Sequence, residues 1–377
     1  MDELKVIIAG GGTGGHVYPG LAMRDALRER CGSVDATFVG AHGGAEEGIL
    51  AAERLVLLPG RGLRGASAAA RLSASLWLAR AVLRGIGVAR ALRPDVVIGT
   101  GGYASAAMVI AAMALRIPTV LQEQNSVPGL VNRRLARFAD LVLLAFAGSE
   151  RYLPRGARWQ AVGNPLRAMP RPSRAEAARR LGLDPALPTV LVVGGSRGAH
   201  ALNVAAVDAA RRMLVAGDVQ FVLLTGRDDR EAVSDALRAE AARVKVIAYL
   251  EDMHNAYAAA DVAAARAGAS SLFELAAFGV PTVFVPYPHA ADAHQARNAA
   301  ALVDRGAALV VSDAELTGER LATEVSALLA DAGRREGMRR ALAQWAPTDA
   351  AQRAAAAVVE VAKKKARGAG VPEPVAA

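Results

Sequence analysis

The sequence predicts an α/β protein with two doubly wound domains, each a parallel sheet covered by helices. Three observations support this prediction. The chain has 377 residues, more than the roughly 100 to 150 that an ordinary single core encloses. Short apolar runs alternate with helical stretches in both halves, and three of these runs lead into a glycine-rich loop that opens a helix. A stretch rich in proline and arginine, RAMPRPSRAEAARR, reads as a linker between the halves.

Composition narrows the class further. Hydrophobic residues make up 53% and charged residues 21% of the chain, which is typical of folded protein everywhere except the tail GAGVPEPVAA. The single cysteine, Cys31, excludes an internal disulfide and a cysteine-based metal site. No leader segment is visible, and the longest apolar stretch is broken by Arg116 and Pro118, so we expect a cytoplasmic chain that does not cross a membrane.

The formal charge of +9 allows three kinds of partner: nucleic acid, an anionic membrane surface or an anionic substrate. No recognition helix, zinc knuckle or interleaving of basic and aromatic residues is present, so we expect no nucleic acid partner.

The first half contains seven expected strands. They are residues 5–9, 36–40, 55–59, 95–98, 118–121, 141–146 and 159–162. The first strand runs into GGGTGGH (10–16), and Pro19 is expected in the first turn of the following helix. A nicotinamide-binding fold would end its second strand with an acidic residue, but Gly40 to Gly43 read GAHG. We therefore expect no such cofactor, and no cofactor of any other kind.

A second glycine loop, GTGGYAS (99–105), follows the fourth strand. The fifth strand ends in Gln122, Glu123, Gln124 and Asn125, and polar residues at that end of a strand commonly face a ligand cleft.

A long helix is expected from about residue 66 to 92, with two faces. Leu72, Leu76, Ala79 and Leu83 are predicted to pack on the sheet. Trp77, Arg80, Arg84 and Val88 lie on another face. That face reads either as a contact with anionic lipid or as an ordinary solvated basic surface.

The second half repeats the pattern of the first. Its expected strands are residues 189–193, 220–225, 244–249, 261–265, 281–286 and 308–311, and GGSRGAH (194–200) is the third glycine loop. Residues 266–298 then form a turn, helix, strand, loop and helix, with Glu274, His294 and Gln295 where two helices begin.

The order of these motifs resembles one family. The pieces are GGTGGHVYP, GTGGYAS, EQNSVPG, GNPLR, GGSRGAHALN, YLEDM, RAGASSLFELAAFGVP and PHAADAHQARNA, which run in order from Gly11 to Ala299. Together they resemble the membrane-associated UDP-N-acetylglucosamine transferases of peptidoglycan synthesis, the MurG type.

The resemblance implies the GT-B fold, two Rossmann-like domains facing across a cleft. It implies transfer of N-acetylglucosamine from UDP to the 4-hydroxyl of the muramoyl unit of lipid I, with inversion, to give lipid II. It implies an acceptor and membrane-associated domain at 1–164 and a UDP-sugar domain at 165–345. A carboxyl-terminal helix at 346–366 would join the first domain, with a loose tail at 367–377. The partners would be UDP-N-acetylglucosamine, lipid I and the anionic inner membrane, at whose cytoplasmic face the protein would be peripheral.

Site residues follow from the same motifs. Ser196 would hold the diphosphate and Arg167 would lie near the uracil edge. Leu250 would pair with the base through its main chain, and Met253 would pack beside the nucleotide. Glu274 would accept hydrogen bonds from the ribose hydroxyls. His16 would be the general base for the acceptor hydroxyl or would position the acceptor. The full donor set is Thr13, Gly14, Gly15, Asn125, Arg167, Ser196, Leu250, Met253, Ala269, Ser270, Ser271, Glu274 and Gln295; the acceptor set is His16, Gly102 and Tyr103; the membrane set is Trp77, Arg80 and Arg84.

His294 departs from the glutamine that some family members have at that position, which leaves its own sugar contact open. The chemistry also stands without the resemblance. Displacing UDP requires stabilisation of the leaving diphosphate, which a helix amino terminus provides, and removal of a proton from the incoming hydroxyl, which one histidine provides. No Asp-x-Asp motif is visible, so we expect no required metal ion in the donor site.

Each assignment has a structural alternative. Ser271 with Glu274, and Asp292 with Gln295, read as capping boxes at helix starts. Arg167 reads equally as a solvated linker charge, His16 as a local hydrogen-bonding group, and Ser196 as a helix cap. The competing functions are a UDP-N-acetylglucosamine 2-epimerase, an NAD-dependent oxidoreductase and a non-catalytic lipid-binding protein.

Overall fold

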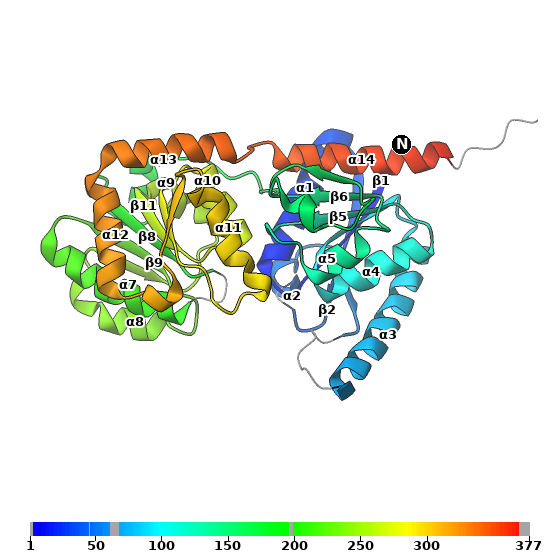
Figure 1. Ribbon diagram of the computed structural model, residues 1–377, viewed down its shortest axis with the longest axis horizontal. Coiled ribbons are helices and arrows are strands. Elements are labelled where there is room, and N and C mark those ends of the chain that lie inside the picture. Colours follow the sequence, from blue (N-terminus) through cyan, green and yellow to red (C-terminus); the bar gives the residue numbers. More distant parts are fainter. Residues whose placement is uncertain (1–2, 45, 61–67, 196–198, 369–377) are drawn as a thin grey trace, which may run out of the picture. The chain divides into compact units, whose positions relative to one another are not determined.

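The chain folds into two compact units. The structure, a computed structural model, describes residues 3–44, 46–60, 68–195 and 199–368, with the backbone alone at 68–74 and 365–368 (Figure 1). Unit 1 comprises Met1–Arg167 together with Asp349–Ala377, and unit 2 comprises Ala168–Thr348.

Unit 1 is built on a seven-stranded parallel sheet in the order β3-β2-β1-β4-β5-β6-β7. The strands are β1 (Leu4–Gly10), β2 (Val34–Ala41), β3 (Leu55–Leu58), β4 (Val96–Gly101), β5 (Thr119–Glu123), β6 (Leu141–Leu144) and β7 (Trp159–Ala161). The strand order reverses between β1 and β4. In doubly wound sheets, ligands bind outside the carboxyl ends of the strands at such a point.

Helices cover both faces of this sheet because its strands are apolar on both sides. Val6 and Ile8 of β1 face a core shared with α1 (Gly14–Cys31) and α14 (Ala350–Gly368), which lie beside each other in Figure 1. Ile7 faces the opposite core, under α3 (Ala68–Leu92) and α4 (Gly102–Ala114). The remaining helices of the unit are α2 (Glu46–Ile49), α5 (Leu130–Leu135) and the 3-10 turn Ser149–Tyr152.

Unit 2 repeats this plan with six parallel strands in the order β10-β9-β8-β11-β12-β13. The strands are β8 (Thr189–Val193), β9 (Gln220–Leu224), β10 (Val244–Ile247), β11 (Val262–Ala265), β12 (Thr282–Phe284) and β13 (Ala308–Val310). Its α-helices are α6 (Arg174–Arg180), α7 (His200–Ala216), α8 (Arg230–Ala236), α9 (Met253–Ala259), α10 (Ala269–Ala277), α11 (His294–Val303), α12 (Gly318–Ala330) and α13 (Ala332–Trp345). Short 3-10 turns lie at Arg238–Glu240, Ala291–Ala293 and Asp313–Glu315. Here the strand order reverses between β8 and β11.

The predicted fold class is confirmed, and each predicted strand is found among the described residues with small shifts at its ends. The stretch predicted as a linker is partly helical, because Ser173 caps α6 and Arg174 pairs with Asp261 at 2.6 Å. Pro19 lies in the second turn of α1, not the first, because the helix already begins at Gly14.

The predicted packing face of α3 is wrong. Leu76 and Leu83 are 61% and 69% exposed, and Ala79 is exposed as well; at Leu72 only the backbone is described. The helix instead packs on α4 through small residues, among them the buried Ala81 and Ala89. A Cβ placed on Gly85 would lie 3.1 Å from the Cβ of Ala111, so this side lets the two helices approach closely. The leucines are left on the outer side of α3.

Candidate functional site

The first two glycine loops of unit 1 meet at the reversal of strand order. Gly10 at the end of β1 pairs with Gly101 at the end of β4. A Cβ on Gly102 would lie 2.6 Å from the carbonyl oxygen of Gly11, so the loops touch through their main chains. Both loops were expected from the sequence, and the structure brings them into contact.

His16 lies against both loops. Its Nδ1 is 2.9 Å from the carbonyl oxygen of Gly11, and the side chain is half-buried. A carbonyl oxygen only accepts, so Nδ1 carries the proton and Nε2 of the neutral ring keeps its lone pair. A Cβ on Gly101 would lie 2.9 Å from Nε2, so the glycine leaves that nitrogen uncovered on this side.

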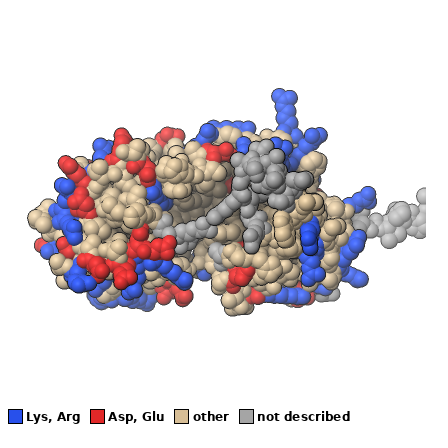
Figure 2. Space-filling model, turned by 90° about the horizontal axis from the view of Figure 1, so that it is seen from below, with Lys and Arg blue, Asp and Glu red and all other residues tan. Residues whose placement is uncertain are grey.

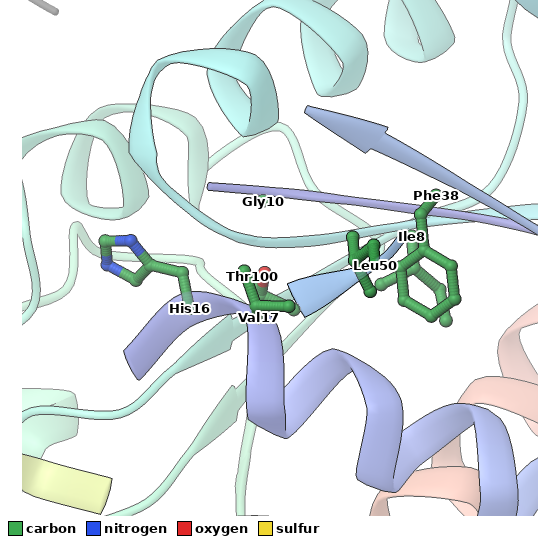
Figure 3. A pocket seen from close by; sticks show the side chains of 7 residues that line it. All are labelled: Ile8, Gly10, His16, Val17, Phe38, Leu50 and Thr100. Carbon is green, nitrogen blue, oxygen red and sulfur yellow. The ribbon is translucent and has the colours of Figure 1, made fainter. Parts of the chain in front are cut away.

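A small hollow beside His16 is lined by both apolar and polar residues. Its lining residues are Ile8, Gly10, His16, Val17, Phe38, Leu50 and Thr100. In Figure 3 the imidazole ring turns away from Ile8, Leu50 and Phe38. His16 thus directs its polar ring away from the apolar end of the hollow.

Glu46 is a residue of this site that the sequence reasoning missed. Its side chain is buried, and its carboxylate accepts from the N–H of Gly12 at 2.8 Å and of Ala41 at 2.9 Å. A Cβ on Gly11 would overlap this carboxylate. The signal in the sequence was a glutamate six residues after Gly40, beyond the position where a ribose-binding acid is sought.

The other predicted residues at the start of α1 form its first turn. Thr13 is the residue before the helix and makes no side-chain cap, and Gly14 and Gly15 are the first two helical residues. Arg167 also belongs to unit 1, where its guanidinium stacks over the ring of Tyr18 at 4.6 Å. Arg167 is exposed at the end of unit 1, so it is a solvated charge, as the alternative has it, with one aromatic contact.

The polar residues at the end of β5 organise a loop, contrary to the expectation that all four face a ligand. Gln122, Glu123 and Gln124 are buried. Glu123 accepts from the main-chain N–H groups of Asn125 and Gly129, each at 2.9 Å. Of the four, Asn125 alone is half-buried, because Glu123 turns the chain outward at that point.

Tyr103, on the first turn of α4, is half-buried. Its hydroxyl has no hydrogen-bond partner among the described residues, and burial raises the pKa of this phenol. Gly102 precedes it where the two glycine loops touch.

In unit 2, Glu274 is held by a buried tyrosine. The Tyr257 hydroxyl donates to Oε2 of Glu274 at 2.6 Å. Burial and then the neighbouring Glu274 raise the pKa of Tyr257 well above its ordinary value. The capping box at Ser271 is wrong, because α10 already begins at Ala269 after Gly268.

The first turn of α10 carries the remaining predicted residues of this segment. Ala269 is buried, and Ser270 and Ser271 are half-buried. The Ser270 hydroxyl has no partner among the described residues. This turn follows β11, beside the point where the strand order of unit 2 reverses.

Gln295 also has a structural partner that the sequence did not indicate. Its Oε1 accepts from the main-chain N–H of Tyr287 at 2.9 Å. The residue before α11 is Ala293, in a left-handed conformation, and Asp292 lies one residue earlier in the 3-10 turn. His294 places Nδ1 2.8 Å from the carbonyl of Ala291.

The remaining donor residues lie on loops of unit 2. Leu250 follows β10 and Met253 opens α9, and both are half-buried. Ser196 lies outside the described residues.

Beyond the third loop, α7 begins with a pair that the sequence reasoning missed. His200 Nδ1 lies 2.9 Å from Oδ1 of Asp229, and the Asn203 amide donates to Oδ2 of Asp229 at 2.7 Å. Partial burial opposes ionisation of Asp229, but these two hydrogen bonds outweigh it and lower its pKa.

The outer side of α3 carries the predicted membrane residues. Trp77 is 41% exposed, and the Arg80 guanidinium lies over it, 5.4 Å from the ring centroid. Arg84 is exposed beside the uncovered Leu76 and Leu83, and α3 contains no acidic residue. Figure 2, which looks toward this side, shows more basic than acidic side chains on unit 1.

Both units match models of one glycosyltransferase family. Residues 6–144 match the glycosyltransferase family 28 N-terminal domain, and residues 189–354 match the family 28 C-terminal domain.

Relatives match over nearly the whole chain. A protein of Anaeromyxobacter dehalogenans is 39% identical over 367 residues, 96% of this chain and 94% of its own. One of Chlorobaculum tepidum is 41% identical over 349 residues, 89% of this chain and 95% of its own. Both are named UDP-N-acetylglucosamine–N-acetylmuramyl-(pentapeptide) pyrophosphoryl-undecaprenol N-acetylglucosamine transferase.

Two solved structures are similar to this chain along nearly its whole length. A crystal structure of Acinetobacter baumannii MurG is 28% identical, with a TM-score of 0.74 over 95% of this chain and 99% of that one. A UDP-N-acetylglucosamine 2-epimerase structure is 16% identical, with a TM-score of 0.65 over all of both chains, which shows a shared fold alone. The chain, matched in both halves and along nearly its whole length, belongs to glycosyltransferase family 28.

Proposed function

We propose that this chain transfers N-acetylglucosamine from UDP-N-acetylglucosamine to the 4-hydroxyl of the muramoyl unit of lipid I, with inversion, to form lipid II. The names of the relatives that span nearly the whole chain support this choice of substrates. The observation that carries the chemistry is His16, whose Nδ1 is engaged by a main-chain carbonyl while Nε2 lies beside a glycine.

An inverting transfer is one displacement at the anomeric carbon and needs a base for the incoming hydroxyl. Nε2 of His16 accepts that proton as the oxygen attacks, and the bond to UDP breaks on the opposite face of the sugar. Gly102 and Tyr103, which follow Gly101 at the start of α4, are assigned to the acceptor side.

Donor recognition is assigned mainly to unit 2. Glu274 accepts from the ribose hydroxyls, with Tyr257 fixing its carboxylate. Ser196 and the start of α7 receive the diphosphate, because free N–H groups and the helix dipole stabilise an anion there. The main chain at Leu250 pairs with the base, and Met253 packs beside the nucleotide. Gln295, with Ala269, Ser270 and Ser271 of the same segment, contacts the sugar and ribose.

Five further assignments lie in unit 1. Thr13, Gly14 and Gly15 at the start of α1, and Asn125 after β5, complete the donor contacts. Arg167, stacked on Tyr18, contributes a fixed positive charge to uracil recognition.

Association with the cytoplasmic face of the inner membrane is assigned to the outer side of α3. Among the described helices, none combines the length and the apolarity that crossing a bilayer requires. Trp77, Leu76 and Leu83 supply apolar contact, and Arg80 and Arg84 attract anionic headgroups. This arrangement supports peripheral binding.

One assay tests the reaction. The purified chain is incubated with labelled UDP-N-acetylglucosamine, with and without a lipid I analogue, and the products are separated. UDP release that depends on the acceptor is expected. Formation of the 2-epimer without acceptor would instead identify an isomerase and reject transfer.

The role of His16 is tested by His16→Ala. We expect turnover to fall about 10²- to 10⁴-fold, the usual contribution of a positioned general base, while UDP affinity stays within about twofold. Titration calorimetry with UDP and the coupled UDP-release assay separate the two effects. Near-normal turnover would exclude His16 as the base.

A further inference from the structure

Glu46 and His16 contact the same peptide group from opposite ends. The N–H of Gly12 donates to Oε2 of Glu46 at 2.8 Å. The C=O of Gly11 belongs to the same amide and accepts from Nδ1 of His16 at 2.9 Å. One main-chain amide therefore joins a carboxylate to the imidazole of the proposed base.

The carboxylate is held firmly in this place. The Glu46 side chain is fully buried, and its other oxygen accepts from the N–H of Ala41 at 2.9 Å. Gly11, Gly40 and Gly44 surround it, and a Cβ on any of the three would lie too close to its side chain. A buried carboxylate is costly unless it is hydrogen-bonded, so the glycines and N–H groups act together to retain it.

The geometry has an electrical consequence. A carboxylate that accepts from an amide N–H polarises that amide and makes its carbonyl oxygen a stronger acceptor, since hydrogen bonds in a chain reinforce one another. The stronger carbonyl favours the neutral ring form with the proton on Nδ1. Nε2, the nitrogen beside Gly101, then remains able to accept a proton.

We propose that Glu46 is a positioning residue that holds His16 in the Nδ1–H tautomer through the Gly11–Gly12 peptide. It touches no substrate. The inference rests on the proposed function only in taking His16 as the base.

Ring-nitrogen NMR tests the tautomer directly. The chain, which has six histidines, is labelled with ¹⁵N at the imidazoles, and His16 is assigned with a His16→Gln variant. At about pH 8.5, well above the ordinary pKa of a histidine side chain, we expect a protonated Nδ1 and an unprotonated Nε2 in the unaltered chain. In Glu46→Gln we expect a mixture of tautomers.

Kinetics supply a second readout. In Glu46→Gln we expect kcat to fall roughly tenfold or more, a part of the general-base contribution, with KM for UDP-N-acetylglucosamine within about twofold. Glu47→Gln is the matched control. Glu47 is the next residue and accepts from the N–H of Gly43 at 2.7 Å, but it does not contact the Gly11–Gly12 peptide. The Glu47→Gln variant should have the same kcat and the same His16 tautomer as the unaltered chain.

Two outcomes overturn the inference: an Nε2–H tautomer in the unaltered chain, or a Glu46→Gln variant indistinguishable from Glu47→Gln. The first needs no Glu46 variant and applies even if Glu46→Gln fails to fold. The NMR experiment also uses no substrate. Loss of acceptor-dependent UDP release in the unaltered chain would therefore reject the proposed function without deciding the tautomer.

Discussion

In both units a side chain of the proposed site is held by a buried partner far away in the sequence. Glu274 receives a hydrogen bond from Tyr257, 17 residues earlier, and His16 is linked to Glu46, 30 residues later. In each pair one member is fully or almost fully buried and the other is half-buried. Burial supplies the fixed geometry, and partial exposure leaves the functional group accessible to a ligand.

Removal of the Tyr257 hydroxyl should weaken nucleotide binding. Tyr257→Phe keeps the ring, which packs against Phe278 at 5.4 Å, but deletes the hydrogen bond that orients Glu274. We expect UDP affinity to fall about three- to tenfold, since one such bond contributes roughly 1 kcal/mol. Calorimetry measures this, with Tyr152→Phe in unit 1 as the control. Unchanged affinity would separate Tyr257 from the ribose site.

These two pairs also mark the limit of prediction from the sequence. The ring nitrogen of His16 and the carboxylate of Glu274 were named from motifs, but their partners depend on tertiary contacts that no local pattern encodes. The Ser271 and Gln295 capping boxes had the correct spacing, yet the helices began elsewhere. Spacing identifies a residue type at a helix start and does not determine which residue starts the helix.

The secondary-structure elements were easier to predict than the direction in which they face. Buried parallel strands are apolar runs, so all were visible in the sequence. The packing side of α3 was not visible. Leucines usually form the buried face of an amphipathic helix, but here the small residues Ala81, Gly85 and Ala89 form it. Close approach to another alanine-rich helix selected the small residues. The exposed leucines then join Trp77 and the arginines on one surface.

That surface should bind anionic vesicles. A Trp77→Ala, Arg80→Ala, Arg84→Ala variant is expected to lose most of this binding, because each basic residue contributes about 1 kcal/mol near an anionic surface. Co-sedimentation with vesicles at rising salt measures it. Arg90→Ala, an exposed arginine near the other end of α3, is the control. Full binding by the triple variant would reject α3 as the contact.

The free energy of unfolding should depend on pH through Asp229, which is hydrogen-bonded to the start of α7. Because the pKa of Asp229 is lowered in the fold, its ionised form stabilises the folded state above about pH 4, and this contribution is lost as the pH falls through the lowered pKa. Asp229→Asn should flatten the acid side of a plot of unfolding free energy against pH. A curve parallel to that of the unaltered chain would show that Asp229 is not the responsible group.

The molecule consists of two compact units, one contiguous in sequence and one not. Unit 2 is formed by residues 168–348 alone, whereas unit 1 needs α14 in addition to residues 1–167. Val358, Val359 and several alanines of α14 complete the core under α1. Stability of unit 1 is therefore linked to the far end of the chain.

A substitution in α14 should destabilise unit 1 selectively. Val358 is fully buried, and Val358→Ala is expected to cost unit 1 roughly 2 kcal/mol. Urea unfolding followed by far-ultraviolet dichroism should show an earlier first transition, while UDP binding reports unit 2. The exposed Glu360→Ala is the control. A uniform shift of both transitions would contradict the division into two units.

The position of α14 also affects how the protein is made. A ribosome releases residues 168–348 before it releases α14, so unit 2 can finish folding while one face of the unit 1 sheet is covered by α1 but not yet by α14. During that interval Val6, Ile8 and their neighbours lack their last helical cover. Although it is first in the sequence, the half that carries His16 is the last to be completed. Premature termination before α14 would leave an aggregation-prone sheet attached to a finished unit 2.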